Sequence, residues 1–222
     1  MSEKTLSNSQ RAVHELRERI FSGDLSAGSD HLESELANLL DMSRTPVREA
    51  VLTLESQGLL ELRPRKGVRI LPLSPDDMAD IYDVLTELES HSAERAAEAR
   101  YDEQDLAFLA KAIDDMDKAI AASDLDAWAE ADDRFHAELV RLGRNSRIAG
   151  IVGMMSDQVR RARMTTLFMR PLPTKSNEDH RQVYDAIRDG DGYQARETHR
   201  AHRQHAKSII VELLQRHRLK FL

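Results

Sequence analysis

The amino-terminal part of the fold is decided by the stretch Ser43-Arg44-Thr45-Pro46-Val47-Arg48-Glu49-Ala50. Arg44 and Arg48 stand four residues apart, so both guanidinium groups project from one face of a helix. Ser43 and Thr45 place hydroxyls at its amino end, where free backbone N–H groups favour a phosphate. Pro46 suits the first turn, because its missing N–H costs nothing there. The stretch therefore predicts a helix that enters a DNA groove with its amino end.

Helical spacing of apolar residues predicts two further helices before this stretch, and alternation predicts two short strands after it. The helices are expected at 9–22, 33–40 and 45–57, and the strands at 59–63 and 68–71. Gly58 ends the third helix. The strands flank the basic turn Pro64-Arg65-Lys66-Gly67. Three helices and a basic hairpin describe a winged helix-turn-helix, which we assign to residues 9–72.

The remainder of the chain shows helical signals and no convincing strand. Ser74 and Pro75 form a cap that starts the first of these helices. The helices are expected at 75–99, 103–122, 125–142, 146–168, 176–189 and 192–219. Six helices with short connections predict an all-α antiparallel bundle over residues 75–219. The expected fold class is mainly α.

The composition of the chain indicates the cellular compartment in which we expect the protein. The 222 residues include no cysteine, which excludes disulfides, thiolate zinc sites and cysteine nucleophiles and favours a reducing cytoplasm. No stretch approaches the roughly 18 consecutive apolar residues of a membrane span, and the amino terminus lacks a signal-peptide core. We expect a cytoplasmic protein without a membrane partner.

The net charge of −7 is unevenly distributed along the chain. Residues 43–70 hold six Lys or Arg against three acids, whereas residues 73–222 hold 22 basic and 28 acidic side chains. Salt screens distant charges within about 8 Å, so a local surplus is enough to attract a polyanion. A small basic module joined to an acidic one is compatible with double-stranded DNA as a partner.

The amino-terminal module closely resembles the winged helix of GntR-family transcription regulators. The pieces that carry the resemblance are Leu25-Ser26-Ala27-Gly28-Ser29, Leu32-Glu33-Ser34-Glu35-Leu36-Ala37, Met42 to Ala50 and Leu54-Glu55-Ser56-Gln57-Gly58-Leu59-Leu60. The resemblance implies that Arg44, Thr45 and Arg48 meet bases and phosphates in the major groove, and that the wing tip at Gly67 approaches the minor groove. Ser34 departs from FadR-like members that carry an Arg there, which implies a different operator.

Two more modest interpretations of these charges remain open. Arg44 and Arg48 could be solvated surface charges or could pair within the helix with Glu49 or a neighbouring acid, because arginines are common on helix surfaces and exposed pairs are weak. Arg65 and Lys66 could be an ordinary hairpin tip. The whole pattern favours DNA contact, so we assign DNA binding to Ser43, Arg44, Thr45, Arg48, Lys66 and Gly67.

The helical half holds seven of the nine histidines. Asp132 and His136 stand four apart on an inward stripe, and His180 and His202 lie on the inward stripes of two later helices. One carboxylate and three imidazoles could therefore converge inside the bundle. Such ligands suit a divalent metal ion, zinc first and nickel, manganese or iron as alternatives.

This half resembles the FCD effector domain of the FadR-like branch. The matching pieces are Asp132-Asp133-Arg134-Phe135-His136, Glu178-Asp179-His180-Arg181, Ala186-Ile187-Arg188-Asp189-Gly190-Asp191 and Ala201-His202-Arg203. The resemblance implies that Asp132, His136, His180 and His202 hold the ion, and that a small organic acid completes its coordination. Leu85 stands near a position where many members carry an Arg, which leaves the effector's class open.

Rival assignments exist within this half. His199 shares the stripe of His202, and Asp133 neighbours Asp132 with a worse direction around the helix. His91, His205 and His217 are interpreted as surface or packing residues. Solvated charge is the first interpretation for each of Arg160, Arg161 and Arg163, and the alternative is that one of them faces the cavity.

The expected protein is a ligand-responsive transcription regulator rather than an enzyme. It would bind a short palindromic operator as a homodimer and respond to a small carboxylate metabolite. One alternative is a metal-dependent enzyme, which lacks support because no further general base or nucleophile is apparent. The other is a DNA-binding protein whose helical half only dimerises.

Overall fold

The computed structural model describes residues 6–216, and its contacts divide the chain into two compact units. One unit ends at Ser74 and the other spans Pro75–Gln215. Each unit has its own apolar core. The mainly α fold class predicted from the sequence is confirmed.

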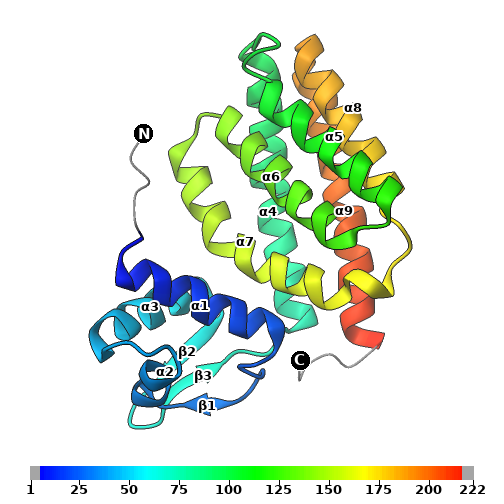
Figure 1. The fold of residues 1–222 in the computed structure, drawn as a ribbon. Helices are drawn as coiled ribbons and strands as arrows, with labels where there is room; N and C mark the ends of the chain where they lie inside the picture. Colours follow the sequence, from blue (N-terminus) through cyan, green and yellow to red (C-terminus); the bar gives the residue numbers. More distant parts are fainter. Residues whose placement is uncertain (1–5, 217–222) are drawn as a thin grey trace. The chain divides into compact units, whose positions relative to one another are not determined.

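The first unit has three helices and a small sheet (Figure 1). The elements are α1 (Asn8–Ser22), β1 (Asp30–His31), α2 (Glu33–Leu39), α3 (Arg44–Ser56), β2 (Leu60–Arg63) and β3 (Gly67–Ile70). The predicted helices and hairpin strands agree with these bounds to within a residue or two. One face of α3 packs into the core through four apolar side chains, Val47, Ala50, Val51 and Leu54. This burial leaves the opposite face of α3 to solvent.

The sheet contains one strand that the sequence pattern did not predict. Its order is β1-β3-β2, and both pairings are antiparallel, with Asp30 opposite Arg69 and Glu61 also opposite Arg69. A strand of two residues is too short to show alternation. Its position is set by pairing with β3. At Gly67, where φ is +86°, an added Cβ would lie 2.3 Å from the carbonyl oxygen of His31.

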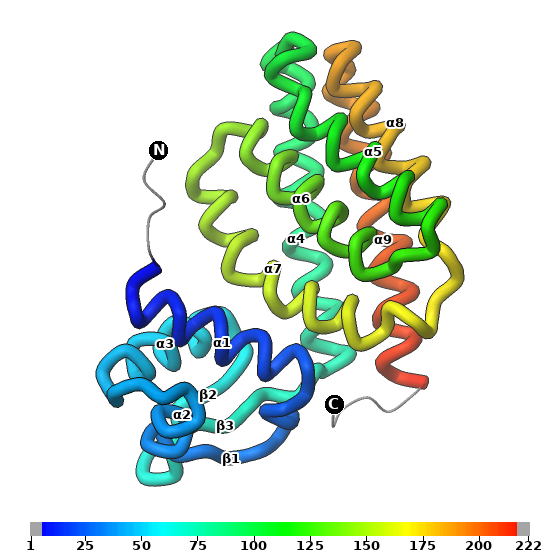
Figure 2. The backbone as a smooth tube through the Cα atoms, in the orientation of Figure 1, coloured from blue at the N-terminus to red at the C-terminus, as the bar shows by residue number. Residues whose placement is uncertain are grey.

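The second unit is a bundle of six α-helices within the described residues (Figure 2). They are α4 (Pro75–Glu98), α5 (Ala107–Ala122), α6 (Leu125–Leu142), α7 (Ser146–Thr166), α8 (Thr174–Asp189) and α9 (Gly192–Arg216), with a 3-10 turn η1 (Leu167–Met169). Helix α5 begins four residues later than predicted, because the Asp102 side chain accepts a hydrogen bond from the Asp105 N–H in a preceding turn. The predicted end of the last helix at 219 lies outside the described residues.

Helix α4 lies at the centre of the bundle and contacts α6, α7 and α8. The apolar core includes Leu109, Trp128, Phe135, Leu139 and Val183. Polar side chains are nevertheless buried in the same interior, notably Glu89, Asp132, His180, His199, His202 and Arg203. Within residues 6–216, none of the helices is long and apolar enough to cross a membrane. These buried polar side chains interrupt the apolar packing of the bundle and mark a candidate site.

Candidate DNA-reading surface and metal centre

The amino end of α3 presents its polar side chains to solvent. Ser43, Arg44, Thr45 and Arg48 are all exposed, and the helix begins at Arg44. Ser43 occupies the N-cap position, yet its side chain makes no capping hydrogen bond. Its hydroxyl and the free N–H groups of the first turn remain available to a phosphate.

Both arginines of this helix extend into solvent. Throughout the described part of the chain, Arg44 and Arg48 have no ion-pair or hydrogen-bond partner. Glu49, the acid considered as their partner, instead accepts a hydrogen bond from the Ser9 hydroxyl. Pairing of these arginines with Glu49 is therefore wrong for this structure. Two exposed guanidinium groups with no internal partner are suited to an external anion.

The wing is the hairpin of β2 and β3, and only some of its cationic side chains are paired with an acid. Arg63 Nη1 lies 3.2 Å from Asp30 Oδ1, and Arg69 Nη1 lies 3.7 Å from Asp30 Oδ2. Arg65 and Lys66 at the tip are exposed and have no such partner among residues 6–216. The positive charge available to DNA is thus concentrated at the tip. Gly67 follows it directly.

Three of the predicted ligands converge inside the bundle. His136 comes from α6, His180 from α8 and His202 from α9, and one ring nitrogen of each lies within 4.8 Å of the others. The Nε2 atoms of His180 and His202 are 3.2 Å apart. His180 is fully buried, and His202 is 5% exposed. Three different helices thus bring these imidazoles to one point.

Asp132 joins this group with one of its two carboxylate oxygens. Its Oδ1 lies 3.8 Å from His136 Nε2 and 3.6 Å from His180 Nε2. Its Oδ2 accepts a hydrogen bond from the Arg163 guanidinium. Arg163 also binds Asp133, which is half-buried and also pairs with Arg160. Asp132 therefore contacts the histidines through Oδ1 and Arg163 through Oδ2, whereas the contacts of its rival Asp133 are with Arg160 and Arg163.

Burial keeps the imidazoles neutral. It lowers the pKa of His136 to about 3 and of His202 to about 4, against the partial opposition of Glu89 and Asp179 respectively. The pKa of His180 also falls well below its ordinary value, first through burial and then through the neighbouring histidines. Neutral imidazole is the form that binds a metal ion. The chemistry of these donors, three neutral nitrogens and one carboxylate oxygen, is that of a divalent metal site.

A second cluster adjoins the first and was not predicted. Glu89 of α4 is 1% exposed and lies against His136, His199 and Arg203. Burial raises its pKa, but Arg203 and His136 outweigh this effect and hold it well below the usual range. His199, the predicted rival of His202, is fully buried and lies 3.1 Å from the Ser90 hydroxyl. A sequence signal for Glu89 existed, because it follows Tyr82 and Leu85 on the inward stripe of α4.

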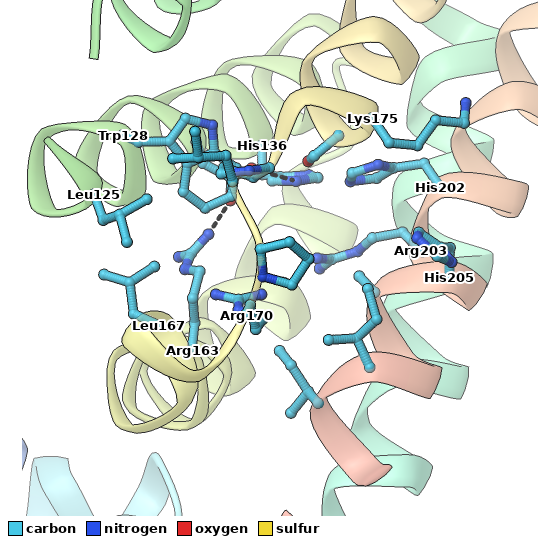
Figure 3. A pocket seen from close by; sticks show the side chains of 18 of the residues that line it. Leu125, Trp128, His136, Arg163, Leu167, Arg170, Lys175, His202, Arg203 and His205 are labelled. Atoms are coloured by element: carbon cyan, nitrogen blue, oxygen red, sulfur yellow. Dashed lines mark hydrogen bonds and ion pairs between the residues drawn. The ribbon is translucent and has the colours of Figure 1, made fainter. Parts of the chain in front are cut away.

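A cavity of about 140 Å³ opens beside the histidines (Figure 3). Its wall includes His136 and His202, and four cationic side chains also line it: Arg163, Arg170, Lys175 and Arg203. Apolar side chains, among them Trp128 and Leu167, make up much of the remainder. The interpretation of Arg161 and Arg163 as solvated charges is wrong, because they are only 3% and 6% exposed. Their positions at the carboxyl end of α7 face the interior.

Of the other bundle histidines within residues 6–216, His91 and His205 lie outside the buried histidine cluster. His91 is half-exposed and His205 is exposed at the cavity rim, which agrees with a surface role. His217 lies outside the described residues. Leu85 is buried and borders a second cavity of about 240 Å³ on the other side of His136. Leu85 is therefore a buried apolar residue near the position where many members of the resembled family carry an arginine.

Comparison with known proteins matches both units to families. Residues 8–70 match the bacterial regulatory proteins of the gntR family, and residues 80–205 match the FCD domain. An uncharacterised HTH-type transcriptional regulator of Agrobacterium vitis is 40% identical over 58% of this chain and 77% of its own length. The gluconate operon transcriptional repressor of Bacillus licheniformis is 34% identical over 63% of this chain and 58% of its own length. The structure titled E. coli McbR/YncC superposes with a TM-score of 0.78 at 20% identity, covering 94% of this chain and 99% of that one, which shows a shared fold.

Proposed function

The chain belongs to the gntR family of DNA-binding transcription regulators with an FCD domain, and from this premise we propose that its helical half binds a divalent metal ion and a small organic acid. The observation that supports the proposal is the convergence of His136, His180 and His202 beside a cationic cavity. The families and relatives that it matches are regulators, not enzymes. We infer a cytoplasmic location from the DNA partner.

The residues at the proposed metal site fit such an ion. His136, His180 and His202 offer neutral nitrogens, and Asp132 offers Oδ1 while Arg163 retains its Oδ2. Zinc is our first choice, with nickel, manganese or iron as alternatives. When bound, the ion would supply a Lewis-acidic position for a carboxylate oxygen. The side chains of this chain hold that position away from bulk water.

The proposed effector is a small carboxylate metabolite. Arg163 and Arg203 are buried in the cavity wall, and Arg170 and Lys175 add positive charge to its lining. Arginine guanidinium groups bind carboxylates through paired hydrogen bonds. The name of the Bacillus licheniformis relative refers to gluconate, an organic acid, which supports the same ligand class. The mixed lining suits a molecule with an acidic end and an apolar body.

For DNA, we propose a homodimer on a palindromic operator. Arg44, Thr45 and Arg48 of each α3 would enter a major groove, with Ser43 at a phosphate and Lys66 and Gly67 of each wing at a minor groove. The effector would regulate binding only if it has a different affinity for the DNA-bound and free forms. Exposure of the unpaired arginines supports the DNA part of this proposal.

Two readouts test the proposal. Protein purified without chelator should contain about one metal ion per chain, measured by mass spectrometry after removal of loosely bound metal. A small-acid panel that includes gluconate should then raise the melting temperature of the metal-loaded protein and change its operator affinity. Absence of bound metal at saturating zinc would favour the alternative in which the helical half only dimerises. Unchanged operator affinity at saturating acid would remove the regulatory switch.

A further inference from the structure

A buried carboxylate contacts the outer side of one proposed metal ligand. Glu89 Oε2 lies 2.9 Å from His136 Nδ1, and the two residues are 47 positions apart on α4 and α6. An ionised carboxylate has no hydrogen to donate. His136 Nδ1 must therefore carry the hydrogen of this bond. The lone pair of the neutral ring is then at Nε2, the nitrogen that lies 3.8 Å from Asp132 Oδ1.

The other two imidazoles lack an equally close outer partner. His202 Nδ1 is 3.7 Å from Asp179 Oδ2, which is beyond hydrogen-bond distance. His180 Nδ1 is buried and has no hydrogen-bond partner in the described part of the chain. Among the described residues, Glu89 is consequently the side chain best placed to set the tautomer of a ligand in this cluster. The other carboxylate oxygen of Glu89 contacts Arg203.

Glu89 could hydrogen-bond to His136 or serve as a ligand of a second cation, and its contact with Arg203 favours the first role. Arg203 Nη2 donates to Glu89 Oε1 over 2.6 Å, and the Arg203 guanidinium lies 5.2 Å from the centre of the Tyr82 ring. Glu89, His136 and His199 also form a group whose ligand atoms could hold a cation. A buried guanidinium in contact with Glu89 would repel a second cation there. Hydrogen bonding to His136 is therefore the favoured role of this carboxylate.

We propose that Glu89 is a positioning residue for the metal site, which orients His136 and holds its hydrogen on Nδ1 so that Nε2 faces the ion. This inference rests on the proposed metal function. Outer partners of this kind contribute about 10- to 100-fold to metal affinity. Arg203 fixes Glu89 in turn, so the order of contacts is Arg203, Glu89, His136 and then the ion.

The decisive variant is Glu89→Gln, which keeps the shape of the side chain and gives it one donor end. Arg203 requires an acceptor, so the amide oxygen should remain opposite Arg203 and the amide NH₂ should face His136. That NH₂ would donate to Nδ1 and move the ring hydrogen to Nε2. Nitrogen-15 NMR of the metal-free proteins should show the Nδ1–H tautomer of His136 in the wild type and Nε2–H in the variant.

Metal affinity provides the second readout, measured by zinc and cobalt competition against a chelator. Glu89→Gln should bind about 10- to 100-fold more weakly than wild type. The double variant E89Q/R203M frees the amide oxygen to accept from His136 and should recover most of that loss. Glu94→Gln is the matched control, because Glu94 pairs with Arg196 and His91 outside the cavity. The control should bind like the wild type.

The outcomes separate the two proposals. A wild type that binds no metal would overturn both this inference and the metal part of the proposed function. Wild-type affinity in Glu89→Gln, an Nε2–H tautomer of His136 in the metal-free wild type, or no recovery in the double variant would overturn the inference alone. Two bound ions per chain would make Glu89 a ligand instead. The wild-type tautomer decides the matter even if Glu89→Gln does not fold.

Discussion

The two units of this regulator place their functional charges in opposite environments. On α3, Arg44 and Arg48 are exposed and have no partner among residues 6–216, whereas in the bundle Arg163 and Arg203 are buried and each contacts a carboxylate. An exposed guanidinium remains solvated until DNA arrives, so it needs no internal partner. A buried charge without a partner would be strongly destabilising. The candidate DNA-reading surface therefore consists of isolated side chains, and the bundle interior consists of a network of paired charges.

This difference has a practical consequence for mutation. A surface arginine can be removed without disturbing the fold, because nothing inside the protein depends on it. Removal of one member of the buried network leaves other polar groups unsatisfied. Changes to α3 should thus alter DNA binding alone, and changes to the bundle should alter stability and metal binding together.

The largest effect is expected from the double variant R44A/R48A. Operator affinity should fall by about 10²- to 10⁴-fold, since each base-reading arginine contributes about 1–3 kcal/mol. Fluorescence anisotropy with a labelled operator at fixed salt measures this, and the melting temperature should be unchanged. Arg188→Ala removes an exposed arginine of α8 and should leave affinity unaltered. Equal operator affinities for R44A/R48A and wild type would remove α3 as the reading element.

The bundle core should show the next effect. Phe135 is fully buried and its ring centre lies 4.2 Å from that of His180, so Phe135→Ala should lower the free energy of unfolding by about 3–5 kcal/mol. Urea denaturation followed by circular dichroism measures the change. Phe168 is 73% exposed, and Phe168→Ala should stay within about 0.5 kcal/mol of wild type. Similar losses of unfolding free energy in Phe135→Ala and Phe168→Ala would contradict the placement of Phe135 in the core.

Metal binding should respond to a change on α9. His202→Gln replaces a proposed ligand, and zinc affinity should fall at least about 10-fold, because loss of a ligand should exceed loss of an outer partner. Chelator competition measures the affinity. His205→Gln, three residues on and exposed, is the matched control. If His205→Gln weakened zinc binding as much as His202→Gln, the ligand set would be wrong.

The smallest effect should come from the wing. Lys66→Ala removes an exposed cation that has no acidic partner among residues 6–216, so the slope of log affinity against log salt should decrease by about 1. Arg63→Ala removes a cation already paired with Asp30 and should change the slope less. A salt titration of operator binding compares the two. A larger change in slope for Arg63→Ala than for Lys66→Ala would place the DNA contact at the base of the wing.

The sequence predicts the helices well because each carries a local signal. Apolar spacing and breaks such as Gly58 mark α1, α3 and the bundle helices, and the basic turn marks the hairpin. Strand β1 has only two residues, and Asp30 pairs with Arg69, which lies 39 positions further along the chain. No local pattern encodes such a pairing. The missed strand is thus a tertiary feature.

The candidate sites divide in the same way. The amino end of α3 is contiguous in sequence, so its exposed residues could be identified together, whereas their DNA contacts stay a prediction. In the bundle, the inward stripes indicated His136, His180 and His202. Glu89 was missed, because its contact with Arg203 spans 114 positions. An acid on an apolar stripe shows burial, but its partner cannot be inferred from spacing.

The close approach at Gly67 bears on the engineering of hybrid regulators. The His31 carbonyl lies where a Cβ of residue 67 would be, and Asp30 pairs with both Arg63 and Arg69. A wing transplanted as residues 60–70 alone would lose its third strand and leave two arginines without their acid. The transferable cassette is therefore discontinuous, and it comprises the hairpin together with the two residues of β1.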